Sequence, residues 1–215
     1  MKIGVFDSGR GGEFIANGLS ALLPDNDYVV IDDRDHVPYG SRTDPEVIAL
    51  TGTAIQPLLN AGCPIIVIAC NTATMASIEY LRATYKSTLF VGIEPMIKPA
   101  ATLSKSRHIT VLGTPLTMAS SRYSHLKATH ASGLRIDEPD ASGWAAHIEH
   151  DNADHISFEA LSQSVADGSD VIVLACTHYI TLKDKLESLY PDVTVLEPTE
   201  AIARQISLLR DVHGL

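Results

Sequence analysis

Two segments of nearly the same pattern occur in this sequence, and this duplication constrains the fold more than any other feature. In residues 64–72 and 170–178, a run of β-branched apolar residues leads to a cysteine, Cys70 or Cys176, and then to hydroxyl, amide or imidazole side chains. The two cysteines lie 106 residues apart, about half of the 215-residue chain. Each cysteine therefore marks the same point in one of two similar stretches.

Two further pairs of segments share this offset. Residues 2–8 align with 108–114, and residues 28–32 align with 134–138. Three pairs at one spacing predict two related halves, each of which presents one thiol at the end of a strand. Two thiols that face each other across a cleft could act as a pair of bases.

Short apolar strands alternate with amphipathic helices along both halves, which is typical of parallel α/β sheets. The expected strands cover residues 2–6, 28–32, 65–69, 88–92, 108–112, 133–137, 170–175 and 193–196. The expected helices cover residues 11–23, 45–61, 73–85, 115–127, 142–149, 157–167, 181–189 and 198–210. We therefore predict an α/β protein of two pseudosymmetric domains, each with a central, mostly parallel sheet flanked by helices.

The expected domain boundary lies near residues 92–95, where a strand ends and Glu94-Pro95 begins a new element. We assign residues 1–93 to the first domain, together with a C-terminal helix at about 205–215, and residues 94–204 to the second. Ligands of such folds bind beyond the carboxyl ends of the strands. The chemically capable residues that fall at these ends are Asp7, Asp33, Cys70, Thr114 and Cys176.

Composition excludes several classes of function. The net charge is −10 and the basic residues are scattered, which argues against nucleic-acid or anionic-membrane partners. No apolar run reaches the roughly 18 residues of a membrane span. Three cysteines, two of them in buried-strand contexts, do not suggest a disulfide framework. We expect a cytoplasmic protein with reduced thiols.

Cys70 and Cys176 are the strongest candidates for chemistry. Each follows a buried strand and precedes an expected helix, whose N-terminus lowers a thiol pKa and favours the thiolate. His178, two residues after Cys176, could share a proton with that thiol or with a substrate amine. The alternative is a pair of buried apolar cysteines, a common fate of this residue. We interpret Cys63, which precedes a proline at a strand start, as structural.

Asp7 opens a glycine-rich turn that leads into the first expected helix. Glycines there let the backbone approach a ligand, and exposed N–H groups can hold a carboxylate. A nucleotide site is the competing interpretation, because Asp33 lies where a ribose-binding acid would be. The dinucleotide fingerprint, however, needs glycine where Phe14 stands. Asp7 is therefore better explained as the acid–base partner of a thiol, or as a plain helix cap.

A metal site is a further alternative. A group of acidic and imidazole side chains follows the only tryptophan, and it comprises His147, Glu149, His150, Asp151 and His155. Their spacing fits no well-defined zinc motif, so we interpret the group as a solvated acidic stretch and predict no metal.

Together these residues resemble the glutamate racemases of the aspartate/glutamate racemase family. The matching stretches are 7–9 with 11–12, 38–40, 69–73 and 176–179. They occur in family order across most of the chain. The resemblance implies two α/β domains with the active site in the cleft between them. It also implies a homodimer and a cofactor-independent enzyme that interconverts L- and D-glutamate and supplies D-glutamate for peptidoglycan.

The resemblance further implies roles for individual residues. Cys70 and Cys176 would be the two acid/base groups, working on opposite faces of the substrate Cα. Asp7 would assist proton transfer beside Cys70, and His178 beside Cys176, while Glu149 loosely matches the second-side carboxylate of the family. The residues expected to hold the substrate are Asp7, Ser8, Tyr39, Gly40, Asn71, Thr72, Thr114, Thr177 and His178.

Other functions stay open at this stage. Another amino-acid racemase of the same family, such as an aspartate racemase, would use the same two thiols. A non-catalytic small-molecule binding protein would keep the polar strand ends but would not need both thiols. A hydrolase would need a single Cys–His pair.

Overall fold

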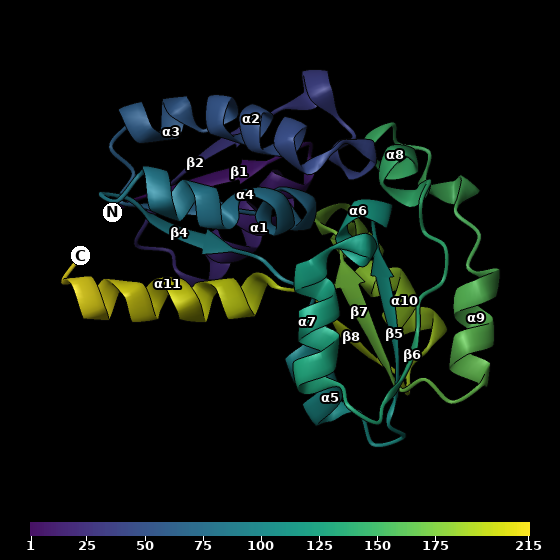
Figure 1. Ribbon diagram of the computed structural model, residues 1–215. Coiled ribbons are helices and arrows are strands. Elements are labelled where there is room, and N and C mark those ends of the chain that lie inside the picture. The colour runs from purple at the N-terminus through teal and green to yellow at the C-terminus, as the bar shows by residue number, and fades with distance from the viewer. The chain divides into compact units, whose positions relative to one another are not determined.

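The computed structural model describes residues 1–215 and divides them into two compact units (Figure 1). The first unit comprises Met1–Ile93 and Pro198–Leu215, and the second comprises Glu94–Glu197. The chain passes from the first unit to the second between Ile93 and Glu94, within the expected range of 92–95. The second crossing lies between Glu197 and Pro198, not near residue 204, because the last helix, α11 (Thr199–His213), belongs as a whole to the first unit.

The first unit is built on a four-stranded parallel sheet with the order β2-β1-β3-β4. Its strands are β1 (Lys2–Asp7), β2 (Asp27–Asp32), β3 (Ile65–Ile68) and β4 (Leu89–Gly92). Its helices are α1 (Gly11–Leu22), α2 (Asp44–Ala54), α3 (Gln56–Asn60), α4 (Asn71–Thr84) and α11, with short 3₁₀ turns η1 (Arg34–His36) and η2 (Tyr39–Ser41).

The second unit repeats this plan with the strand order β6-β5-β7-β8, again all parallel. Its strands are β5 (His108–Gly113), β6 (Arg135–Asp137), β7 (Val171–Ala175) and β8 (Thr194–Leu196). Its helices are α5 (Ile97–Leu103), α6 (Pro115–Ala119), α7 (Ser121–His130), α8 (Trp144–Glu149), α9 (Glu159–Ala166) and α10 (Lys183–Leu189), with 3₁₀ turns η3 (Ala153–His155) and η4 (Thr177–Leu182).

The predicted duplication is confirmed by strand order and by register. Phe6 of β1 pairs with Ile68 of β3, and Leu112 of β5 pairs with Leu174 of β7. These pairs obey the offset of 106 residues found in the sequence. Because the two central strands of each sheet run in parallel, the residues that follow them emerge at the same edge, at the point where the strand order reverses.

Burial of apolar side chains holds each sheet in place. All four residues of β3 and all five of β7 are buried, as expected for strands covered by helices on both faces. Full burial of one such side chain contributes about 1.5–3 kcal/mol. In the first unit, α1 and α11 approach closely, since a Cβ on Gly18 would lie 2.6 Å from Thr199 Cγ2.

Two expected helices are interrupted, and one helix was not expected. The stretch 45–61 divides at Ile55, because Pro57 cannot donate a backbone hydrogen bond to the preceding turn. The stretch 115–127 divides at Ser120, whose Oγ accepts a hydrogen bond from the Tyr123 N–H and begins a new helix. Helix α5 lies at a proline-containing stretch without a clear helical pattern. No helix of either unit is both long and apolar enough to cross a membrane.

Candidate active site

Cys70 lies at the carboxyl end of β3 and caps the N-terminus of α4. Its side chain is buried, with 7% exposure, and its Sγ accepts a hydrogen bond from the Ala73 N–H at 3.4 Å. The hydroxyl of Ser8, which follows β1, lies 3.3 Å from the same sulfur. The pairing of β1 with β3 brings these two residues together, so the sheet itself builds the candidate half-site of the first unit.

The surroundings of Cys70 favour its protonated form. Burial raises the pKa of the Cys70 thiol to about 11, and the nearby Asp7 carboxylate adds to the rise. The contacts from Ser8 and from the Ala73 N–H act in the opposite direction but are outweighed. The expectation that the helix end would favour a thiolate is therefore wrong for Cys70, because desolvation of the charge exceeds the stabilisation that the helix end supplies.

Asp7 is the last residue of β1 and is fully buried. Its Oδ1 accepts a hydrogen bond from the Gly9 N–H at 2.8 Å. The first turn of α1 packs directly on it, since a Cβ on Gly12 would lie 3.0 Å from Asp7 Cβ. The glycine-rich turn thus lets the helix close over a carboxylate that stands beside the Cys70 thiol.

Tyr39 also belongs to the first half-site, since its phenol lies near Cys70. It lies in η2 with 1% exposure and packs against Phe6, with ring centroids 6.4 Å apart. Its hydroxyl donates to Asp33 Oδ2 at 2.6 Å, and His36 Nδ1 lies 2.7 Å from Asp33 Oδ1. Burial and this hydrogen bond raise the pKa of the Tyr39 phenol, as does the neighbouring Cys70. Asp33 therefore positions Tyr39, a role that the sequence did not reveal.

Asn71 and Thr72 occupy the first turn of α4 and are 3% and 2% exposed. The Oδ1 atom of Asn71 is buried without a hydrogen-bond partner in the protein. A buried polar atom without a partner is costly, so a ligand group that donates to it would be stabilising. Gly40, which follows Tyr39 in η2, completes the predicted residues of the first unit.

The second half-site is a line of three side chains. Cys176, with 6% exposure, follows β7, and its Sγ lies 3.8 Å from His178 Nδ1. The other ring nitrogen, His178 Nε2, lies 2.6 Å from Glu149 Oε2. In a neutral ring, a carboxylate at Nε2 favours a proton on that nitrogen, and Nδ1 then presents its lone pair toward the sulfur. This arrangement can accept the thiol proton.

Aromatic packing holds Glu149 in place. Glu149 ends α8, and Trp144 at the start of that helix packs edge-on against Tyr179 and Phe158, with ring centroids 5.7 and 5.3 Å apart. The Tyr179 hydroxyl donates to the Ala141 carbonyl at 2.8 Å, which fixes the loop before α8. Tyr179 thus links the turn that carries His178 to the helix that carries Glu149.

The remaining predicted residues of the second unit lie at the same sheet edge. Thr114 follows β5, caps α6 and bonds Thr117, and Thr177 is the first residue of η4. Because Gly113 pairs with Ala175, Thr114 occupies the position next to Cys176 that Ser8 occupies next to Cys70. In neither unit do three or more His, Cys, Asp or Glu side chains form a group suited to a metal ion.

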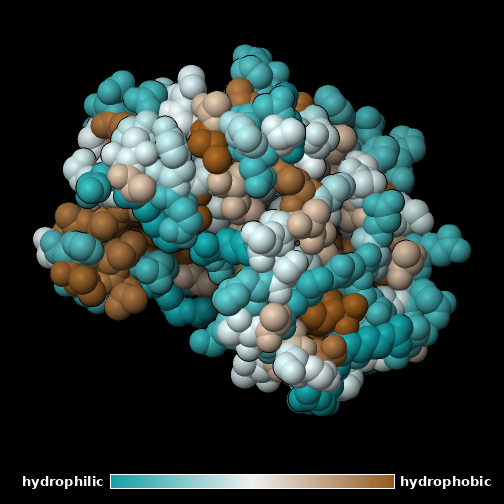
Figure 2. Space-filling model, in the orientation of Figure 1, coloured by the Kyte–Doolittle hydropathy of each residue, from teal (hydrophilic) through white to brown (hydrophobic).

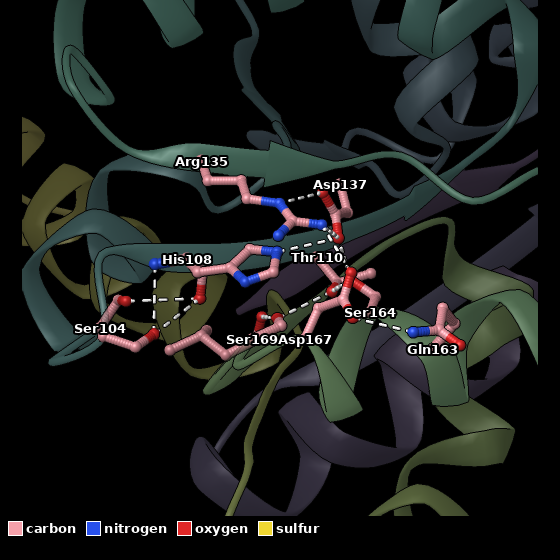
Figure 3. A network of polar contacts seen from close by, with 11 residues as sticks. Ser104, His108, Thr110, Arg135, Asp137, Gln163, Ser164, Asp167 and Ser169 are labelled. Carbon is pink, nitrogen blue, oxygen red and sulfur yellow. Dashed lines mark hydrogen bonds and ion pairs between the residues drawn. The ribbon is translucent and has the colours of Figure 1, made fainter.

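A polar network that is buried at its centre and exposed at its margin lies elsewhere in the second unit (Figure 3). It surrounds the first half of β5, away from the carboxyl end where Thr114 and Cys176 stand. Ser164 Oγ donates to Asp137 Oδ2 at 2.7 Å, and Thr110 Oγ1 lies 2.6 Å from Ser164 Oγ. The other labelled members are Ser104, His108, Arg135, Gln163, Asp167 and Ser169. The network ties α9 to the sheet and is separate from the candidate site.

Comparison with known proteins identifies the family. The family model described as Asp/Glu/hydantoin racemase matches residues 15–206. The chain belongs to this family. Among its racemases, the sequence is similar to glutamate racemases, and it is 37% identical to the enzyme of Herpetosiphon aurantiacus over 97% of this chain and 84% of that protein. It is also 37% identical to the glutamate racemase of Lachnospira eligens, over 89% of this chain and 75% of the relative.

Solved racemase structures agree with this relationship. Escherichia coli glutamate racemase, in complex with L-glutamate and the activator UDP-MurNAc-Ala, superposes with a TM-score of 0.87 at 27% identity, covering 98% of this chain and 82% of that one. The Thermus thermophilus glutamate racemase superposes with a TM-score of 0.78, also at 27% identity. Picrophilus torridus aspartate racemase, at 18% identity, shares the fold. The chain is thus a racemase of the glutamate racemase group.

Proposed function

We propose that this racemase interconverts L- and D-glutamate by moving the Cα proton between two cysteines. The proposal rests on one observation: each sheet ends in a cysteine at the equivalent position, and each cysteine lies beside a polar side chain, Ser8 for Cys70 and His178 for Cys176. The identity to glutamate racemases supports glutamate as the substrate. The L-glutamate bound to the E. coli enzyme supports the same choice.

In the proposed cycle, Cys176 starts as the base. Its thiol proton passes to His178 Nδ1, while Glu149 stabilises the resulting imidazolium through Nε2. The thiolate then removes the Cα proton of one glutamate enantiomer. An S–H bond forms, the Cα–H bond breaks, and the electron pair is left on the substrate as a carbanion-like state.

Cys70 starts as the acid. Its pKa of about 11 keeps the thiol protonated near neutral pH, so it can donate to the opposite face of the same carbon. After donation, Cys70 is the thiolate and Cys176 is the thiol, which is the form that accepts the other enantiomer. The proposed reaction can therefore run in both directions, because each turnover exchanges the roles of the two sulfurs.

The polar groups at the strand ends hold the substrate. Backbone N–H groups at the start of α4 and at the glycine turn after Asp7 are suited to carboxylates. The unpartnered Oδ1 of Asn71 is suited to accept a hydrogen bond from the substrate ammonium group. The complete set assigned to binding is Asp7, Ser8, Tyr39, Gly40, Asn71, Thr72, Thr114, Thr177 and His178.

We include the wider setting in the proposal. The enzyme works without a cofactor or metal, as a cytoplasmic homodimer, and supplies D-glutamate for peptidoglycan. Added pyridoxal phosphate and EDTA are therefore expected to leave the racemisation rate unchanged. Turnover that a chelator abolishes would contradict the metal-free mechanism.

The decisive experiment follows proton exchange at Cα in deuterated water. With L-glutamate, the wild type should incorporate deuterium and invert, as read by chiral chromatography and mass spectrometry. Cys70→Ser and Cys176→Ser should each lose racemisation, since a general acid–base group contributes roughly 10²–10⁴-fold. Cys63→Ala, which alters a buried cysteine outside both half-sites, should retain wild-type turnover.

Two outcomes would overturn the proposal, and a third would correct its substrate. Racemisation by both serine variants would refute the two-thiol mechanism. Binding of glutamate without exchange would indicate a binding protein. Faster inversion of L-aspartate than of L-glutamate in the same assay would replace the substrate and leave the mechanism intact.

A further inference from the structure

Exposed apolar side chains are concentrated on one face of the first unit. Seven large apolar residues of the molecule are exposed, and four of them lie in α1, in α11 or just after α11: Leu22, Leu208, Val212 and Leu215. Val212 is 69% exposed and Leu208 is 54% exposed. Figure 2 shows a broad brown patch where helix α11 lies in Figure 1. Such a patch marks an interaction surface in a soluble protein.

A groove runs along this face between α1 and α11. Its cavity volume is about 520 Å³. The apolar part of its lining is Leu22, Leu23, Ala203 and Leu208. Charged side chains of both signs stand along the same groove, namely Glu200, Arg204 and Asp211. The groove is therefore an apolar strip with charges at its margins, as in the interfaces between folded proteins.

The order of residues along α11 is self-complementary. Arg204, Leu208 and Asp211 recur at helical spacing, so they share one face of the helix. If a second α11 runs antiparallel across this face, with a two-fold axis beside Ser207 and Leu208, Arg204 of each copy meets the partner's Asp211. The same register sets Val212 of each copy opposite the partner's Ala203, a small residue of the groove.

We propose that this face is the contact between two copies of the chain, paired through antiparallel α11 helices. Charge complementarity favours a second copy over an unrelated partner, because a two-fold axis satisfies Arg204 and Asp211 twice with the same contact. The inference names the surface of the homodimer included in the proposed function. The dimer surface is tested by measuring the mass of the protein and the racemase mechanism by measuring turnover, so either proposal can fail without the other.

The first test measures the mass of the protein in solution by light scattering and sedimentation over a range of concentrations. The wild type should reach twice the 23.1 kDa of one chain. Leu208→Glu should weaken dimerisation at least tenfold, because it sets two carboxylates against each other at the axis. The control is Leu189→Glu in α10, which changes a residue of similar exposure, 51%, on the second unit and should not alter the mass.

A charge exchange tests the register. Arg204→Asp and Asp211→Arg should each weaken the dimer, and the double variant should restore it, because the pair is rebuilt with reversed signs. The intrahelical contact of Arg204 with Glu200 is exposed and worth little, so its loss does not obscure the result. Circular dichroism checks that each variant is folded.

A cysteine placed at the axis gives an independent reading. The three native cysteines are buried, so Leu208→Cys introduces one accessible thiol. Mild oxidation should yield a covalent dimer on a non-reducing gel, and the same change at Leu189 should not. A monomeric wild type at high concentration, or a dimer that Leu208→Glu leaves unchanged, would overturn the proposal.

Discussion

The two cysteine half-sites share a scaffold but differ in the chemistry around the sulfur. Both cysteines follow the second central strand of a sheet with the same strand order, and both precede a helical segment. Cys70 is surrounded by a hydroxyl, a helix N–H group and the Asp7 carboxylate. Cys176 instead faces an imidazole that a carboxylate holds from behind.

In the proposed mechanism, this difference separates the acid from the base. An imidazole at Cys176 can take the thiol proton, whereas the carboxylate at Cys70 disfavours a second negative charge. The backbone supplies equal positions in the two units, and the side chains supply unequal proton affinities. A two-base reaction needs one thiol and one thiolate at the start of each turnover.

The largest expected effect comes from replacing the imidazole that lies beside Cys176. His178→Asn should lower kcat/KM by roughly 10²-fold or more, because Cys176 loses its proton acceptor. Glu149→Gln should lower kcat/KM less, since the imidazole remains but its partner is neutral. Polarimetry of both enantiomers is the measurement, and the losses should match in the two directions because L- and D-glutamate have equal free energies. A Glu149→Gln variant with unchanged kcat/KM would contradict the proposed role of Glu149 in supporting the His178 imidazole.

A second comparison concerns the interior of the two sheets. Thr110 of β5 is equivalent to Gly4 of β1, where Leu58 and Ile66 cover the strand instead. Thr110→Val removes the hydroxyl that bonds two buried serines and should lower the free energy of unfolding by about 1–3 kcal/mol. Thermal and urea unfolding give the value. Thr102→Val, at an exposed helix hydroxyl, is the control and should stay within about 0.5 kcal/mol.

A smaller effect sharpens the account of Cys70. Asp7→Asn removes the negative charge that adds to the effect of burial, so the pKa of Cys70 should fall below about 11. Thiolate absorbance against pH, in a background with Cys63→Ala and Cys176→Ala, isolates this thiol. An unchanged titration curve would show that burial alone sets the pKa.

The smallest effect is a pH dependence of stability in the second unit. Burial tends to raise the pKa of Asp137, but hydrogen bonds from Ser164, His108 and Arg135 outweigh it and hold the pKa below its usual value. This stabilisation is present above the unfolded pKa, near 3.9, and is lost as the pH falls through the lower folded pKa. The stability difference between wild type and Asp137→Asn should therefore shrink below about pH 4. A difference that grows on acidification would refute the assignment.

Local patterns in the sequence predicted most of the fold. The apolar runs before Cys70 and Cys176 identify the central strands, and their common offset predicts the duplication. The breaks at Ile55 and Ser120 were missed, because a single proline or a serine cap interrupts a helical pattern only when the neighbouring turn adopts the required geometry. Helix α5 was missed because its stretch lacks a clear helical period.

The candidate site was predictable in its residue types but not in its internal contacts. Asp7, Cys70, Cys176 and His178 stand at strand ends that the sequence already marks. The contact between Glu149 and His178 joins residues 29 positions apart, and it depends on how α8 packs against Tyr179. The same holds for Asp33, whose carboxylate was considered for a ribose and instead binds the Tyr39 hydroxyl.

The amino-acid sequence alone determined three properties of the chain. It determined which segments are buried strands, which of these strands lead to a thiol, and that the pattern occurs twice. These properties depend on near neighbours in the chain. Tertiary structure decided the protonation of Cys70 and the partner of His178, because desolvation and hydrogen bonding depend on groups that only folding brings within a few ångströms.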